Sequence, residues 1–181
     1  MKTPLALKIE NYEKPIKELI GKAILSVHYY EIDYGEPYWN SIDHHSIDYG
    51  LEIKTDDDET YYFIWDKQFV CYDLKFTKGK IQQEFSQNAN VKIHRITHQN
   101  WNEVIGKKVV SIQSVWSYIL DKDGTIYYPE TIQLKFINNR NVWISAVEIG
   151  EGITPCMADH ISVFFDEGTM NKHNINSENK L

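Results

Sequence analysis

The chain has 181 residues, of which 42% are hydrophobic, 13% aromatic and 25% charged, and 19 Lys and Arg against 26 Asp and Glu leave a formal net charge of −7. This composition excludes disorder of the whole chain, because a chain of this length buries enough surface to form a core without disulfides or metal ions. The acidic balance argues against a general nucleic-acid-binding protein, which needs clustered Lys and Arg.

Targeting and cysteine signals point to a simple location. The first ten residues contain no continuous apolar stretch, and no apolar run approaches the ~20 residues of a membrane span. We therefore expect a cytoplasmic protein with no membrane partner. Cys71 and Cys156 lie far apart with no paired spacing, so we expect buried free thiols rather than a disulfide framework or a zinc site.

An internal repeat organises the chain. The segment around Ile20, Gly21 and Lys22 matches the segment around Ile105, Gly106 and Lys107 at an offset of 85 residues. Further matches follow at offsets of 83 and 80, so the length changes fall between the matching blocks, where loops are expected. The two repeats cover about 12–77 and 98–166.

Each repeat predicts the same series of elements. A short helical segment ends at Gly21 or Gly106, a residue that tolerates positive φ, and a strand, a hairpin and a final strand follow. The abundant Tyr, Phe and Trp favour strands. The predicted helices are 12–20 and 98–105; the predicted strands are 22–30, 49–55, 60–65 and 69–76 in the first repeat, and 107–118, 131–137, 141–147 and 160–165 in the second, with an extra strand at 91–96.

These elements predict an α+β fold that is predominantly antiparallel β. A hairpin-based sheet with one apolar face needs a cover, and a second similar copy supplies it. We expect one compact domain over residues 1–166, in which two pseudo-symmetric repeats pack as a sandwich or as two facing sheets with short helices. Residues 167–181, rich in Asn and Ser, are expected to form a flexible tail.

The long loop of the first repeat holds the most site-like residues. Pro37 precedes Tyr38 and Trp39, which are residue types that anchor protein interfaces. His44 and His45 follow Asp43 and have the chemistry of zinc or iron ligands, but neighbours on a strand point in different directions and no further ligand has a recognisable spacing. We therefore expect surface histidines and no metal.

A second candidate surface is the run of four acids from Asp56 through Asp57 and Asp58 to Glu59. It lacks the pattern of a calcium loop, and the second repeat has Asn138, Asn139 and Arg140 at the same place, so the run is predicted to be a hairpin turn. Four exposed carboxylates would attract a basic partner and raise its association rate.

Catalytic motifs are missing from the sequence. It contains no G-x-S-x-G elbow, no P-loop and no G-x-G-x-x-G fingerprint. His94 and His98 have an H-x₃-H spacing, but Arg95 stands where a zincin requires Glu. We expect a protein that is not an enzyme and that has no cofactor.

The order of an aromatic residue, an Ile-Gly-Lys turn, an alternating strand, a hairpin and a terminal aromatic strand resembles small bacterial immunity proteins of polymorphic or contact-dependent toxin systems. The resemblance covers 101–166 best and 12–65 less well. It implies a cytoplasmic, non-enzymatic protein that binds one toxin and blocks its active site. No functional residue is carried over from the resemblance, because such families share no diagnostic motif.

The leading hypothesis is therefore a binding protein that neutralises a basic toxin domain. Tyr38 and Trp39 would anchor the toxin, and the acidic turn would steer it. The alternative is a small β-rich domain that binds a metal or metabolite, with hydrolytic activity, through Asp43, His44, His45 and His94. A third hypothesis is an assembly module that uses an exposed sheet edge.

Overall fold

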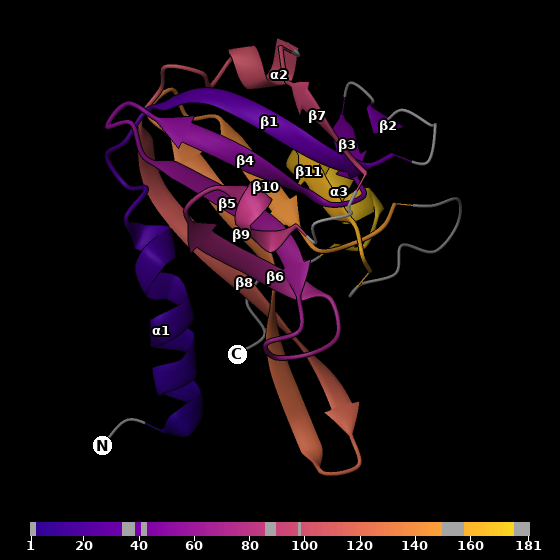
Figure 1. Cartoon of the computed structure of the whole chain (residues 1–181). Helices are drawn as coiled ribbons and strands as arrows, with labels where there is room; N and C mark the ends of the chain where they lie inside the picture. The colour runs from indigo at the N-terminus through magenta and orange to yellow at the C-terminus, as the bar shows by residue number, and fades with distance from the viewer. Residues whose placement is uncertain are drawn as a thin grey trace.

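The computed structural model describes residues 3–33, 39–40, 43–85, 90–97, 99–149 and 158–175. It contains two antiparallel sheets, with strand orders β6-β5-β4-β1-β7 and β2-β3-β11-β10-β9-β8 (Figure 1). The strands are β1 Ile24–Ile32, β2 Trp39–Asn40, β3 His44–Ile47, β4 Gly50–Thr55, β5 Thr60–Asp66, β6 Asp73–Lys78, β7 Val91–Arg95, β8 Val109–Asp121, β9 Gly124–Phe136, β10 Asn141–Ser145 and β11 Ile161–Phe164. The helices are α1 Pro4–Lys17, α2 Gln99–Asn102 and α3 Glu167–Lys172, with a 3-10 helix η1 at Ile81–Glu84.

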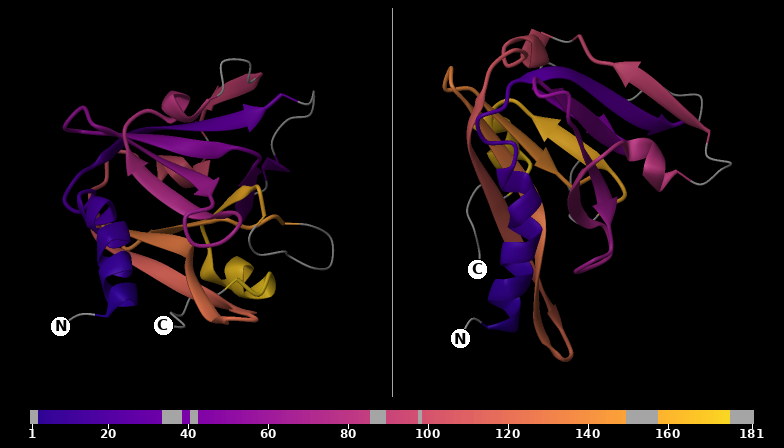
Figure 2. Two further views of the ribbon diagram at one scale, coloured as in Figure 1. Left: turned by 60° about the horizontal axis from the view of Figure 1, so that its bottom comes forward. Right: turned by 60° about the vertical axis from the view of Figure 1, so that its left-hand side comes forward.

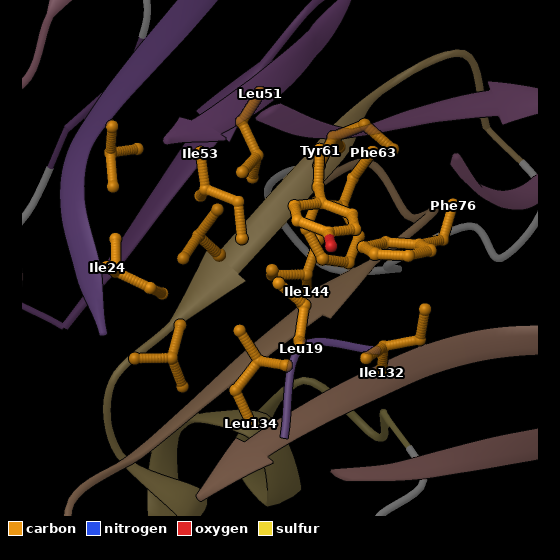
Figure 3. Packing of buried hydrophobic residues seen from close by; sticks show 14 of the residues in the cluster. Leu19, Ile24, Leu51, Ile53, Tyr61, Phe63, Phe76, Ile132, Leu134 and Ile144 are labelled. Carbon is orange, nitrogen blue, oxygen red and sulfur yellow. The ribbon is translucent and has the colours of Figure 1, made fainter. Parts of the chain in front are cut away.

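The two sheets face each other and enclose one hydrophobic core. They form two layers when the molecule is viewed from its lower end (Figure 2, left). Leu51, Ile53 and Phe63 of the first sheet lie in the same buried cluster as Ile132 and Ile144 of the second (Figure 3). The predicted β-rich α+β class is confirmed, and both repeats contribute to the same core.

The four main strands of the two repeats correspond in order. In the first sheet β1, β4, β5 and β6 are consecutive neighbours, and in the second β8, β9, β10 and β11 follow in the same way. The turns agree as well, because Asp58 and Asn139 both have positive φ, near 66° and 61°. Asp and Asn adopt this conformation more readily than most residues, which explains why the predicted hairpin turns occur at these positions.

The repeats meet where the two Ile-Gly-Lys segments cross. Gly21 N–H donates to Val109 O at 2.8 Å, and Gly106 N–H donates to Ile24 O at 2.7 Å. Ala23 and Lys108 form the antiparallel bridge between these bonds. Both glycines have positive φ, 89° and 74°, so the chain leaves each helical segment and turns directly into this pairing.

The first helix differs from the predicted range 12–20. It begins at Pro4, where the Thr3 side chain accepts a hydrogen bond from Ala6 N–H at 3.2 Å, and it ends at Lys17. Thr at the N-cap followed by Pro at the first helical position is a start signal that the apolar pattern alone does not reveal. Pro15 lacks the N–H that would donate to the carbonyl of residue 11, and after Lys17 the N–H groups of Glu18, Leu19 and Ile20 donate three residues back instead of four.

The final strand of the first repeat also begins later than predicted. Residues 69–72 form a turn instead of the start of β6, because the buried Asp73 carboxylate accepts the N–H groups of Phe69 and Val70. Cys71 lies on this turn and is exposed, which corrects the expectation of a buried thiol. Cys156 lies outside the described residues.

Two further segments correct the sequence-based expectations. Residues 44–47, predicted to be loop, form β3, which leaves the first repeat and pairs with β11 of the second. Residues 167–172, expected in the flexible tail, form α3, and Met170 and Ile175 are buried against Trp143 and Phe164 on the outer face of the second sheet. Apolar residues spaced along an Asn-rich segment are therefore a packing signal.

None of the helices in the described part of the chain is long and apolar enough to cross a membrane.

Gly106→Ala tests the crossing. No heavy atom lies within 4 Å of the place that a Cβ would take at this residue, so the substitution strains only the left-handed backbone. We expect a loss of about 1 kcal/mol in the free energy of unfolding, measured by urea denaturation. Lys107→Ala, at the next and exposed residue, is the control and should change stability by less than about 0.5 kcal/mol. Equal effects of the two substitutions would contradict the requirement for glycine.

Candidate protein-binding surface

The loop residues predicted to bind a partner differ in their exposure to solvent. Asp43 is exposed, whereas His44 is 9% exposed and His45 is fully buried. Tyr38 lies outside the described residues, and so does the side chain of Trp39, whose backbone forms β2. The expectation that both histidines are surface residues is wrong, because β3 points His45 into the core and His44 is covered by Phe164 and by His173 at the end of α3.

His45 ends a buried hydrogen-bond relay. Trp101 Nε1–H donates to Tyr29 Oη at 2.6 Å, and Tyr29 Oη lies 2.6 Å from His45 Nδ1. An indole can only donate, so the Tyr29 hydroxyl accepts from Trp101. The direction of the bond between Tyr29 Oη and His45 Nδ1 is set by the tautomer of the imidazole. The relay links β1, α2 and β3 within the core.

His44 lies on the opposite face of β3. Its ring stacks on Phe164, with centroids 5.9 Å apart, and meets the ring of His173 at 5.4 Å below α3. Burial lowers the pKa of His44, and the nearby His173 lowers it further. Neighbouring residues on a strand point to opposite faces, so the two histidines diverge and cannot hold one metal ion together.

The other proposed ligand does not complete a metal site. His94 lies on β7, directly opposite Tyr29 of β1 in the sheet, and His98 falls outside the described residues. In the described ranges, no group of three or more His, Cys, Asp or Glu side chains is arranged to hold a metal ion.

The acidic hairpin turn is largely neutralised by lysines. Asp57 pairs with Lys22 at 2.7 Å, Asp58 with Lys54 at 2.6 Å, and Glu59 with Lys78 at 3.0 Å. The hydrogen bond from Lys22 lowers the pKa of Asp57 to about 2. Asp56 accepts the Ala23 N–H at 3.0 Å, at the crossing of the repeats. These contacts describe a structural turn, and its field toward solvent is much weaker than four carboxylates suggest.

The negative charge of the chain is concentrated elsewhere. Residues 23–53 and 141–171 contain no Lys or Arg and together carry 11 of the 26 Asp and Glu. The remaining residues have 15 acids and 19 bases, a net charge of +4. All of the net negative charge therefore belongs to two segments that are about a hundred residues apart in sequence.

The fold brings these two segments side by side. β3 from the first pairs with β11 from the second, with Ile47 opposite Ile161 and His44 opposite Phe164. Exposed acids lie at both ends of this strand pair. Together with Glu148, which follows the neighbouring strand β10, they form what we call the acidic surface. Its residues are Asp43, Asp166 and Glu167 at one end, and Asp159 and Glu148 at the other.

A buried carboxyl lies behind this surface. Both oxygens of Glu31 accept the Asp48 backbone N–H at 3.2 Å, at the connection where the chain passes from β3 into β4. Burial raises the pKa of Glu31 to about 7, and the Asp48 carboxylate adds to this effect. Burial also raises the pKa of Asp48, which His160 partly offsets. Ionisation of these two carboxyls is thus less favourable than that of exposed ones.

The acidic surface contains no compact run of like charges, so a search of the sequence for such runs does not find it. The signal that identifies it is the absence of Lys and Arg over 31 consecutive residues, once at 23–53 and again at 141–171. That signal becomes a surface only through the β3–β11 pairing, which neither segment predicts by itself.

No protein-family model, characterised protein or solved structure matches this chain.

Tyr29→Phe tests the buried relay. The substitution leaves the Trp101 N–H and His45 Nδ1 without the hydroxyl that serves both, so we expect a loss of about 2 to 4 kcal/mol in the free energy of unfolding. Tyr118→Phe removes a hydroxyl from a half-exposed ring and should cost less than about 0.5 kcal/mol. Unchanged urea midpoints for Tyr29→Phe would show that the relay adds nothing to stability.

Glu31→Gln tests the buried carboxyl. The folded state holds the Glu31 proton more tightly than the unfolded chain, whose pKa is near 4.5, so this contribution to stability is complete below that pH and is lost as the pH rises through about 7. Gln keeps the shape and an acceptor oxygen but does not ionise. The variant should gain roughly 2 kcal/mol relative to the natural chain between about pH 5 and about pH 8. Parallel pH profiles of the two proteins would refute the raised pKa.

Proposed function

We propose that this chain is a cytoplasmic, non-enzymatic binding protein of the immunity type, which neutralises a basic toxin domain by covering its active site. The observation that carries the proposal is the acidic surface. Two segments without any Lys or Arg, which together account for the net negative charge of the chain, meet at the β3–β11 pair.

Such a charge distribution favours a basic partner for two physical reasons. A patch of one sign draws an oppositely charged protein during its approach and raises the association rate above that of a neutral encounter. The same patch repels acidic proteins, which gives discrimination among partners. In this proposal the acidic surface replaces the lysine-paired turn at Asp56–Glu59 as the steering element.

The affinity in this proposal comes from aromatic anchors. Tyr38 and Trp39 lie within the first basic-free segment, between Asp33 and Asp43 of the sequence. Aromatic side chains in the desolvated centre of an interface carry most of its binding energy, and the charged rim contributes mainly to rate and specificity. The pairing of β2 with β3 connects this part of the chain to the acidic surface.

The metal-binding hydrolytic alternative has less support. It requires His44 and His45 to converge on one ion, whereas His45 faces the core and His44 faces α3. We therefore propose the binding function alone.

The test begins with co-expression of this chain and any toxin-like domain that a neighbouring gene encodes, with cell growth as the readout. The association rate of the two purified proteins is then measured at about 50 mM and about 500 mM NaCl. The triple variant Asp43→Asn, Glu148→Gln and Asp159→Asn removes three exposed charges and should slow association about tenfold at low salt and little at high salt.

A matched control removes the same number of charges from the hairpin turn: Asp57→Asn, Asp58→Asn and Glu59→Gln. Because this turn joins β4 and β5 of the first sheet and the acidic surface lies at the β3–β11 pair of the second, this control should slow association far less than the first triple variant. The proposed surface is wrong if the two triple variants bind alike, and the proposed function is wrong if no basic toxin domain binds and growth is never rescued.

A further inference from the structure

The β8–β9 hairpin extends well beyond the sandwich. Residues 117–128 of this hairpin, here called the arm, project in the same direction as the N-terminal half of α1 (Figure 1; Figure 2, right). An isolated two-stranded hairpin is at best marginally stable in water, so an arm of this kind gains stability when another surface packs against it.

One face of the arm continues the hydrophobic core. Trp116 is buried against Tyr12 of α1, with ring centroids 5.4 Å apart. Alternate residues of a strand share a face, which places Tyr118 and Leu120 in line with Trp116. Their exposed fractions are 46% and 79%. Tyr127 lies directly opposite Tyr118, with centroids 6.1 Å apart, and widens this apolar face.

The apolar stripe of α1 also runs past the sandwich. Leu5, Ile9, Tyr12 and Ile16 follow one another at intervals of four, three and four residues, which is the spacing of one helix face. Tyr12 and Ile16 are buried, whereas Leu5 is 36% exposed. A cavity of about 290 Å³ lies beside the contact between the C-terminal half of this helix and β8, where Ser114 donates to Glu13, and it is lined by Glu13, Ile16, Lys17, Ile112, Gln113 and Ser114.

The charges of these two elements are complementary. The helix α1 has three lysines and two glutamates, a net charge of +1, and the arm has Asp121, Lys122 and Asp123, a net charge of −1. Between Val109 and Leu120, β8 contains no charged residue, although it is a sheet edge, where charged side chains usually prevent pairing. β3 and its acidic surface lie toward the opposite edge of the same sheet.

We propose that two copies of this chain form a two-fold dimer, in which the arm of each copy packs on α1 and the adjoining cavity of the other. The arrangement is isologous, because each copy supplies both the arm and the helix that receives it. It covers Tyr118 and Leu120, pairs an arm of charge −1 with a helix of charge +1, and keeps the two acidic surfaces at the far edges. The dimer does not depend on the proposed toxin binding.

The test is the mass of the full chain in solution, measured by light scattering and sedimentation equilibrium from about 1 µM to about 100 µM. The natural chain should have twice the monomer mass at the higher concentrations. Leu120→Lys places a charge at the centre of the proposed contact and should reduce the mass to that of a monomer. The melting temperature of the monomeric variant should show that it remains folded, because Leu120 is mostly exposed.

Ile137→Lys is the matched control, since Ile137 is 62% exposed and lies beside the β9–β10 turn, away from the arm. This variant should remain a dimer. A natural chain that stays monomeric at every concentration overturns the proposal, and so does a dimer that Leu120→Lys leaves intact. Loss of toxin binding on Leu120→Lys in a chain that is always monomeric would assign the arm to the toxin instead.

Discussion

The arrangement of the two sheets depends on one crossing of the main chain. The segments that follow Gly21 and Gly106, both with positive φ, pair there in antiparallel fashion. Hydrogen bonds from Gly21 to Val109 and from Gly106 to Ile24 attach the first strand of each repeat to the start of the other. Ile24 and Val109 are both buried as a result. From this crossing the two sheets run over each other with their apolar faces together, and the two repeats share one core.

The structure departs from this symmetry where its surface chemistry arises. β3 belongs to the first repeat in sequence but extends the second sheet, pairing with β11. The exchange buries His45 beneath Tyr29 and brings two segments without Lys or Arg together. At the opposite edge of the same sheet, β8 and β9 lengthen into the arm. The core thus follows the repeat, whereas the acidic surface and the arm occur where the repeats differ.

Local chemistry explains which predictions succeed. The hairpin turns at Asp58 and Asn139 follow from residues that adopt positive φ, and the strands beside them follow from alternating apolar residues. The apolar pattern does not predict the start of α1, because the signal for it lies in Thr3. Sequence reasoning places His45 at the surface, since nothing in its own segment predicts the Tyr29 hydroxyl that satisfies its ring nitrogen in the core.

Neighbouring residues are enough to predict the repeat, the order of the main strands in each copy, the antiparallel α+β class and the hairpin turns at Asp58 and Asn139. They do not predict that residues 119–121 and 124–130 extend β8 and β9, which sheet β3 joins, which histidines are buried, or which acids lie together at the surface. The physical reason is that the last three properties depend on pairing between segments far apart in the chain. Asp57 and Asp159 are the same residue type, but the fold gives them different surroundings. Lys22 forms an ion pair with Asp57, whereas the segment that contains Asp159 pairs with a second segment that also lacks Lys and Arg.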